Sequence, residues 1–296
     1  MTNAVRSQGE NLISPQLLDR LACPRCHGAL AQWDSGLRCG ICASEYPPED
    51  GIVDFRVVAS RSGAEDWTDH WAEGRQSRRI QRFFSWYRKV VFSRAVQHYC
   101  DRYFAERGVF LEAGSGTSET SMRLNKFGGS RILVALDIVP SVLKRCHPIM
   151  DVRLAGDIFQ LPFANSSLDG LWNVGVMEHF TESEIDLILS EFRRVLRPQA
   201  PMVLFWPGVD SIPQKLLALV QGAVHIAGRR DFRFHPPEIS QLRSLRHGRE
   251  ILERNGFEVR HLAFGVRSLF AFKVLVGCPA GRASPLEALP RHMDGA

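Results

Sequence analysis

Residues 109–117 of this 296-residue chain read VFLEAGSGT, and this stretch decides the fold. A short apolar run leads into a loop with two glycines, and a segment of helical pattern follows the loop. Gly114 and Gly116 allow the backbone to turn tightly and to approach a ligand closely. A dinucleotide-binding fingerprint would place its third glycine at position 119, where this chain has Glu119. The stretch therefore predicts a strand, a ligand-binding loop and a helix, and it argues against a nicotinamide dehydrogenase.

The same alternation continues downstream. Short apolar runs are separated by segments that are long enough for crossover helices, and the runs lie at 109–111, 132–136, 152–154, 168–174 and 202–206. Such alternation is typical of a parallel sheet with helices on both faces. The clearest predicted helix begins after Thr181, which forms a capping box with Glu184, and it ends before Pro198. A further helix is expected over 239–255, and two more strands are expected over 257–276.

A polar residue follows each of four successive predicted strands: Glu112, Asp137, Asp157 and Asn173. Ligands of parallel α/β sheets bind beyond the carboxyl ends of the strands, so we expect these residues to converge on one site. Asp137 can accept hydrogen bonds from both hydroxyls of a ribose. Asp157 can accept one from an adenine amino group, and the backbone of Ile158 can support the ring. Glu112 suits a ligand with a cationic group, such as the ammonium of S-adenosylmethionine (SAM).

As a set, these motifs resemble those of the class I SAM-dependent methyltransferases, in particular the broad type 11. The matching elements are E-x-G-x-G at 112–116, an acidic residue at 137, G-D-x-x-x-L-P-F at 156–163 and the pair Glu178-His179. The resemblance covers about 108–277. It implies an α/β fold, a Rossmann-like seven-stranded sheet with helices on both faces.

The resemblance also implies that SAM is the cofactor and lies over the first loop. The cofactor-binding residues expected on this basis are Glu112, Gly114, Ser115, Gly116, Asp137, Ile138, Asp157, Ile158 and Asn173. The chain departs from the family pattern at two turns. Ser118 stands where a third glycine is usual, and Gln199-Ala200 replaces a usual pair of glycines.

His179 is the candidate catalytic residue, as a general base, because an imidazole has a pKa close to neutrality. An alternative is that the Glu178-His179 pair only shapes the pocket. An acceptor that is already nucleophilic would need no base. The residues alone leave these alternatives open.

Four of the seven cysteines form two Cys-x-x-Cys pairs, Cys23 with Cys26 and Cys39 with Cys42, with twelve residues between the pairs. Four thiolates can surround Zn²⁺, or iron in the same cage, and leave no open position, so the expected site is structural. The metal would supply folding energy to a module that is too small for a large core. Residues 15–57 resemble the small zinc-ribbon proteins that partner and activate methyltransferases.

These observations divide the chain into five parts. They are a flexible N-terminus (1–14), a zinc ribbon (15–58), a helical linker or lid (59–107), a SAM-dependent methyltransferase domain (108–278) and a disordered tail (279–296). The linker carries seven basic residues and no acidic one between Arg75 and Arg94. Such a block can meet phosphate on nucleic acid or on an anionic membrane, or it can form a solvated helix face.

The composition is that of a globular protein, with 45% apolar and 23% charged residues and a net charge of +5. No apolar run is long enough to cross a membrane, and the first ten residues lack the apolar core of a signal peptide, so a cytoplasmic protein is expected.

Three hypotheses for the function follow. The first is a methyltransferase for a small-molecule or lipid- or glycan-linked acceptor, with peripheral membrane contact as an option. The second is an RNA methyltransferase, and the third is a non-catalytic scaffold with a methyltransferase fold.

Overall fold

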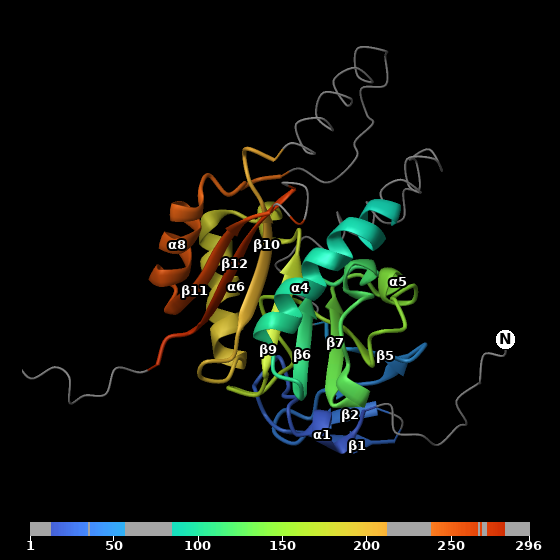
Figure 1. The fold of residues 1–296 in the computed structure, drawn as a ribbon. Helices are drawn as coiled ribbons and strands as arrows, with labels where there is room; N and C mark the ends of the chain where they lie inside the picture. The colour runs from blue at the N-terminus through green and yellow to red at the C-terminus, as the bar shows by residue number, and fades with distance from the viewer. Residues whose placement is uncertain are drawn as a thin grey trace, which may run out of the picture.

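The computed structural model describes residues 13–34, 36–56, 85–211, 238–265, 267 and 271–281, and Figure 1 shows their arrangement. A large sheet lies at the centre, with helices on both faces. Its nine strands follow the order β11-β12-β10-β9-β6-β7-β8-β5-β4. Their bounds, in chain order, are β4 (Pro48–Glu49), β5 (Ile52–Asp54), β6 (Gly108–Ala113), β7 (Arg131–Asp137), β8 (Val152–Ala155), β9 (Gly170–Val174), β10 (Met202–Pro207), β11 (Phe257–Phe264) and β12 (Phe272–Pro279).

The predicted α/β sheet is confirmed, but the expected count of seven strands is wrong. The five strands β6 to β10 run parallel, and β12 lies antiparallel between β10 and β11. These six strands and β11 make up the expected seven. β5 and β4 extend the sheet because β5 pairs in parallel with β8, and this pairing satisfies the backbone groups that β8 would otherwise expose.

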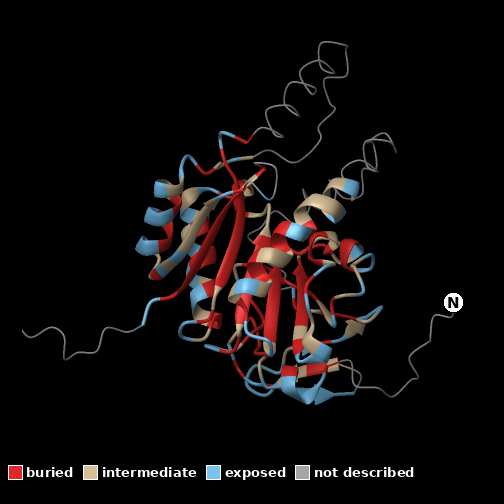
Figure 2. Cartoon of the chain, in the orientation of Figure 1, coloured by how far each residue is buried: buried red, intermediate tan, exposed pale blue. Residues whose placement is uncertain are grey.

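Two helices on opposite faces enclose the core. α4 (Ser93–Tyr103) packs on one face, where Tyr99 meets Phe205 with ring centroids 5.9 Å apart. α6 (Glu182–Val195) packs on the other face. Figure 2 shows that the strands between them are mostly buried, whereas exposed residues lie on the outer sides of the helices.

The predicted capping of α6 is confirmed. The side chain of Thr181 accepts a hydrogen bond from the backbone of Glu184, and the Glu184 carboxylate accepts one from the Thr181 backbone at 2.8 Å. The helix expected over 239–255 is shorter, because α8 spans Leu245–Arg254 and is capped by Ser244. Residues 239–243 are not helical, because their backbone bonds to other segments: Leu242 donates to the Pro207 carbonyl at 2.9 Å.

The N-terminal module contains α1 (Pro15–Leu18) and a three-stranded sheet of β1 (Leu30–Trp33), β2 (Gly36–Cys39) and β3 (Glu45–Tyr46). We call residues 15–46 the ribbon. It lies below the large sheet in Figure 1. Ala22 donates to the Pro162 carbonyl at 3.1 Å, and Arg20 donates to the Ser167 carbonyl at 2.7 Å. The ribbon therefore contacts the segment that leads into β9, at the amino end of that strand.

Among the described residues, no helix combines the length and the apolar character that crossing a bilayer requires. The five-part division of the chain remains a prediction, and its N-terminal segment, most of its linker and most of its tail lie outside the described residues.

Candidate cofactor site and cysteine cluster

The glycine loop follows β6, as predicted, and it is fastened to β7. Gly114 and Ser115 each donate a backbone hydrogen bond to the Leu136 carbonyl at 2.9 Å. Gly114 has φ +71°, and a Cβ atom there would lie 2.8 Å from Val176. Position 114 therefore requires glycine for both its conformation and its close contact. The predicted helix after the loop is reduced to one 3₁₀ turn, η2 (Glu119–Ser121).

Asp137 and Gly116, which are 21 residues apart in the chain, are in direct contact. The Asp137 carboxylate accepts the Gly116 N–H at 2.7 Å and the Val139 N–H at 2.9 Å. The side chain is buried, and burial raises its pKa although both backbone bonds oppose the shift. The expected convergence of the loop and the end of β7 is therefore present, and half-buried Ile138 lies beside it.

Glu112 lies at the same edge of the sheet and is 1% exposed. Ser121 donates to Glu112 Oε1 at 2.8 Å, and Trp172 in turn donates to Ser121 at 3.1 Å. Glu112 Oε2 has no hydrogen-bond partner among the described residues. Burial raises the pKa of Glu112 to about 7. The site thus holds a buried carboxyl group with one oxygen available to a ligand.

The turn after β8 joins the site through the backbone. Gly156 donates to the Asp137 carbonyl at 3.0 Å, so the ends of β7 and β8 lie side by side. Asp157 and Ile158, expected at an adenine ring, are both buried. The Asp157 carboxylate accepts the Phe159 N–H at 3.0 Å.

Asn173 is at the predicted strand end, but it faces away from Glu112. Trp172 points toward Glu112 through Ser121, and successive side chains of a strand point to opposite faces. Asn173 is fully buried, and neither atom of its amide has a hydrogen-bond partner among the described residues. The structure thus brings together three of the four predicted polar groups and places Asn173 on the other face of the sheet.

The Glu178-His179 pair lies in η4 (Met177–His179), directly after β9. His179 Nε2 is 3.8 Å from Glu178 Oε1, and both side chains are almost fully buried. Burial raises the pKa of Glu178 to about 8. Sequence reasoning selected His179 and passed over Glu178. The signal that could have found it is a carboxyl group in an apolar context, next to the end of a central strand.

Glu119, where a dinucleotide site would have glycine, holds the preceding basic helix against the loop. Its carboxylate lies 3.1 Å from Arg88, 3.2 Å from Lys89 and 3.0 Å from the Ser85 hydroxyl. The part of the basic block before Ser85 lies outside the described residues. A segment that the sequence identified as linker therefore contacts the 3₁₀ turn that follows the glycine loop.

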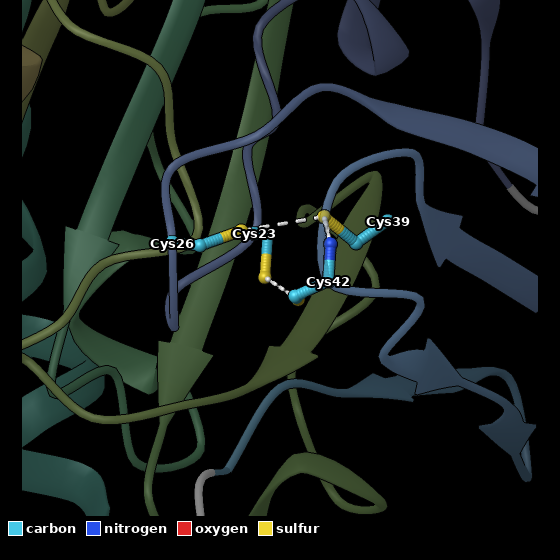
Figure 3. A group of neighbouring side chains, drawn as sticks. All are labelled: Cys23, Cys26, Cys39 and Cys42. Carbon is cyan, nitrogen blue, oxygen red and sulfur yellow. Dashed lines mark hydrogen bonds between the residues drawn. The ribbon is translucent and has the colours of Figure 1, made fainter.

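The four predicted metal-ligating cysteines form one cluster. Their sulfur atoms all lie within 4.8 Å of one another, and Figure 3 shows the two pairs facing each other from two loops. The Sγ atoms of Cys23 and Cys42 are 3.6 Å apart, and those of Cys26 and Cys39 are 3.4 Å apart. Sulfurs at about 2.3 Å from a tetrahedral zinc ion would be separated by about 3.8 Å. The donor set and its spacing therefore fit a closed tetrahedral metal site.

The ribbon supports this cluster with further hydrogen bonds. Tyr46 Oη lies 3.0 Å from Cys23 Sγ, and the backbone N–H groups of Ile41 and Cys42 donate to Cys39 Sγ at 3.4 and 3.5 Å. N–H groups aimed at sulfur stabilise its thiolate form, which is the form that binds metal.

Comparisons with known proteins agree with this geometry. The family described as "Methyltransferase domain" matches residues 111–204. A malonyl-[acyl-carrier protein] O-methyltransferase of Dechloromonas aromatica (strain RCB) is 32% identical over 152 residues, which cover 51% of this chain and 55% of the relative. An enzyme of the same name from Erwinia pyrifoliae is 37% identical over 90 residues, which cover 30% of this chain and 33% of the relative. The matches thus span about half of these relatives or less.

One solved structure supports the fold. It is a chain from the complex of the Haloferax volcanii Trm112 methyltransferase activator with a methyltransferase. It matches with a TM-score of 0.50 and 17% identity, over 75% of this chain and 100% of that chain. Residues 111–204 of the present chain therefore form a methyltransferase domain, and the sheet that contains them has a methyltransferase fold.

Proposed function

We propose that this chain is a SAM-dependent methyltransferase that acts on a small-molecule or lipid- or glycan-linked acceptor. The observation that carries the proposal is the contact of Gly116 with Asp137, beside buried Glu112, at the carboxyl edge of the sheet. A carboxylate that the loop backbone already orients is ready to accept the hydroxyls of a ribose. The unpartnered oxygen of Glu112 suits an ammonium group.

The proposed cofactor site includes the turn after β8. Asp157 and Ile158 would hold the adenine, and Ser115 and Ile138 flank the contact between Gly116 and Asp137. When bound, SAM would supply a methyl group on an electrophilic sulfonium. The role of the chain is then to place a nucleophilic atom in line with that methyl group. Asn173 lies on the opposite face of the sheet from Glu112.

We propose that Cys23, Cys26, Cys39 and Cys42 hold a structural Zn²⁺. All four positions of a tetrahedron are filled by sulfur, which leaves no place for a substrate or a water molecule. The ribbon also contacts residues 162–167, in the segment that leads into β9. Its proposed role is therefore to support the fold.

The acceptor class is supported by the relatives, whose name specifies an acyl-carrier substrate. RNA is the alternative acceptor, and the experiment below distinguishes it from a small molecule.

Calorimetric titration with SAM and, separately, with NADH tests the proposal. The wild-type chain should bind SAM with a dissociation constant on the order of micromolar and should not bind NADH. Asp137→Ala removes two acceptor oxygens and should weaken SAM binding about 100-fold or more. Asp186→Asn, a change on the outer side of α6, is the matched control and should leave the affinity unchanged.

Two outcomes would contradict the proposal. If the folded, zinc-loaded chain did not bind SAM, the scaffold hypothesis would replace it. If methyl transfer required RNA, and RNA binding weakened steeply as salt rises, the acceptor would be nucleic acid.

A further inference from the structure

Three large apolar side chains are exposed where the central strands end. Val209 lies two residues beyond β10 and is 46% exposed, and Phe264 ends β11 and is 56% exposed. Ile239 is 59% exposed, and its backbone N–H donates to the Glu178 carbonyl, just beyond β9, at 2.7 Å. Single exposed apolar residues are ordinary on protein surfaces, but several together mark a site of interaction. We call Val209, Ile239 and Phe264 the apolar rim.

The rim lies at the same edge of the sheet as the cofactor loop. Phe264 pairs with Lys273 of β12, and its ring lies 5.8 Å from the Lys273 ammonium. That ammonium contacts the carboxylate of Asp210, the neighbour of Val209. Because β6, β9, β10 and β11 run in the same direction, the ends of β9, β10 and β11 share the carboxyl edge with the loop that follows β6.

Apolar side chains lie between the rim and the cofactor loop. Val176 contacts the loop, since a Cβ atom at Gly114 would lie 2.8 Å from it. Phe272, at the start of β12, lies against the adjacent Gly175, where a Cβ atom would be 3.6 Å from the ring. Phe92 packs on Phe272 with ring centroids 4.7 Å apart, and all three apolar side chains are half-buried. An acceptor that approaches the loop from this edge therefore meets apolar groups.

The charges at this edge do not favour a strongly charged partner. Arg88 and Lys89 lie 3.1 and 3.2 Å from the Glu119 carboxylate, and Lys273 is paired with Asp210. Paired charges exert little attraction on a nucleic acid or on an acidic protein. In the described part of this edge, apolar contact therefore outweighs charge as a means of binding a partner.

We propose that the apolar rim docks on the surface of a lipid bilayer and that the methyl acceptor is lipid-linked. This inference rests on the proposed function and narrows its acceptor class. Burial of the rim among acyl chains removes apolar surface from water, which stabilises the docked state. The carboxyl edge of the sheet then faces the bilayer, and an acceptor that is anchored there reaches the cofactor loop along Phe272 and Val176.

Sedimentation with sucrose-loaded vesicles tests the docking surface on the full chain. The wild type should bind vesicles of phosphatidylcholine, with or without phosphatidylglycerol. A rise in salt from about 0.1 to 0.5 M should change its partition coefficient less than about twofold, because apolar contacts are not screened.

Variants of the rim should weaken this binding. Phe264→Ser should lower the partition coefficient about 5-fold or more, and serine at all three positions of the rim should lower it about 100-fold. Phe264→Trp keeps an apolar side chain and should retain binding. Leu187→Ser removes an exposed apolar residue from the outer side of α6, so it is the matched control and should bind as the wild type does.

Labelled SAM tests the acceptor class. The chain is incubated with labelled SAM and a total extract of the cells that produce it, and organic extraction then separates lipids from water-soluble molecules. The label should enter the lipid fraction. The triple serine variant should transfer it about 10-fold or more slowly than the wild type, and Leu187→Ser should transfer it at the wild-type rate. Dispersal of the lipids in detergent should narrow the difference, because the acceptor no longer has to be reached at a bilayer.

Several results would overturn the proposal. They are a wild type that does not sediment with phosphatidylcholine vesicles, binding that requires phosphatidylglycerol and disappears at high salt, and equal binding of the rim variants and the wild type. Absence of label from the lipid fraction would also overturn it, and label in a protein fraction would identify a carrier protein as the partner of the rim. SAM titration separates these results from a failure of the proposed function, because the rim variants should bind SAM as the wild type does.

Discussion

Phe55 donates its backbone N–H to the carbonyl of Ala155 at 2.7 Å. Ala155 ends β8, and the turn that contains Asp157 begins directly after it. The Phe55 side chain is 1% exposed and packs against Tyr46, with the two rings tilted and their centroids 4.8 Å apart. The Tyr46 hydroxyl lies 3.0 Å from Cys23 Sγ. Three contacts therefore connect the cysteine cluster to the turn that we propose for the adenine.

Replacement of Phe55 tests this connection. Phe55→Ala leaves a cavity between the ribbon and the sheet and should lower the free energy of unfolding by about 3–5 kcal/mol in urea titrations. The variant should also bind SAM several-fold more weakly, because the turn after β8 loses its support. Leu187→Ala, at a half-exposed position on α6, is the control and should change neither quantity much. Unchanged SAM affinity in a destabilised Phe55→Ala chain would show that the contact is structural only.

Metal removal tests the cysteine cluster. Elemental analysis should find about one zinc ion per chain, and a chelator should lower the temperature of thermal unfolding. Cys39→Ser should have the same effect as the chelator, whereas Cys146→Ser, outside the cluster, should not. Zinc-free protein with an unchanged melting temperature would disprove the structural metal site.

The pH dependence of stability and of SAM binding tests Glu112. Its pKa is raised from 4.5 to about 7, so the folded chain holds a proton that the unfolded chain has already released between these values. The contribution of this group to the free energy of unfolding is therefore full below about pH 4.5 and is lost as pH rises to about 7. The free energy of unfolding of the wild type and of Glu112→Gln is measured by urea titration at several pH values. The difference between the two proteins isolates the contribution of Glu112.

SAM affinity should respond in the opposite direction. Only ionised Glu112 attracts the ammonium, so binding should strengthen as pH rises through about 7 in the wild type and should stay flat in Glu112→Gln. If the SAM affinity of the two proteins changed with pH in the same way, Glu112 would not be the group that contacts the ammonium.

Gln199 offers a test of backbone conformation. It is exposed and has φ +64°, a region that favours glycine, in the turn where the family pattern has a pair of glycines. Relief of the unfavourable φ in Gln199→Gly should raise the free energy of unfolding by about 0.5–1 kcal/mol. The loss of the exposed hydrogen bond from Arg260 to the Gln199 side chain should reduce this gain. Gln199→Ala, which loses the bond and keeps the unfavourable φ, should be less stable than wild type. Equal stability of the two variants would show that the turn is not strained.

Much of the domain could be predicted from local patterns. The strand before Glu112 and its glycine loop, the capping box of α6 and the cysteine spacing each depend on residues that are close together in the chain. Propensity, capping and ligand spacing act over such short distances, so a single sequence carries them. The convergence of Gly116 with Asp137 also follows, because parallel strands end at a common edge.

The sequence by itself thus determined the fold class, the glycine loop and the pairing of the cysteines that form the cluster, since these depend on short-range chemistry. The tertiary structure decided that β5 joins the large sheet, that Asn173 faces away from Glu112 and that α8 begins only at Leu245. It also decided that Glu178, not only His179, is buried beside the end of β9. Each of these outcomes depends on pairing and burial between distant segments, and the energy of such contacts exists only once the chain is folded.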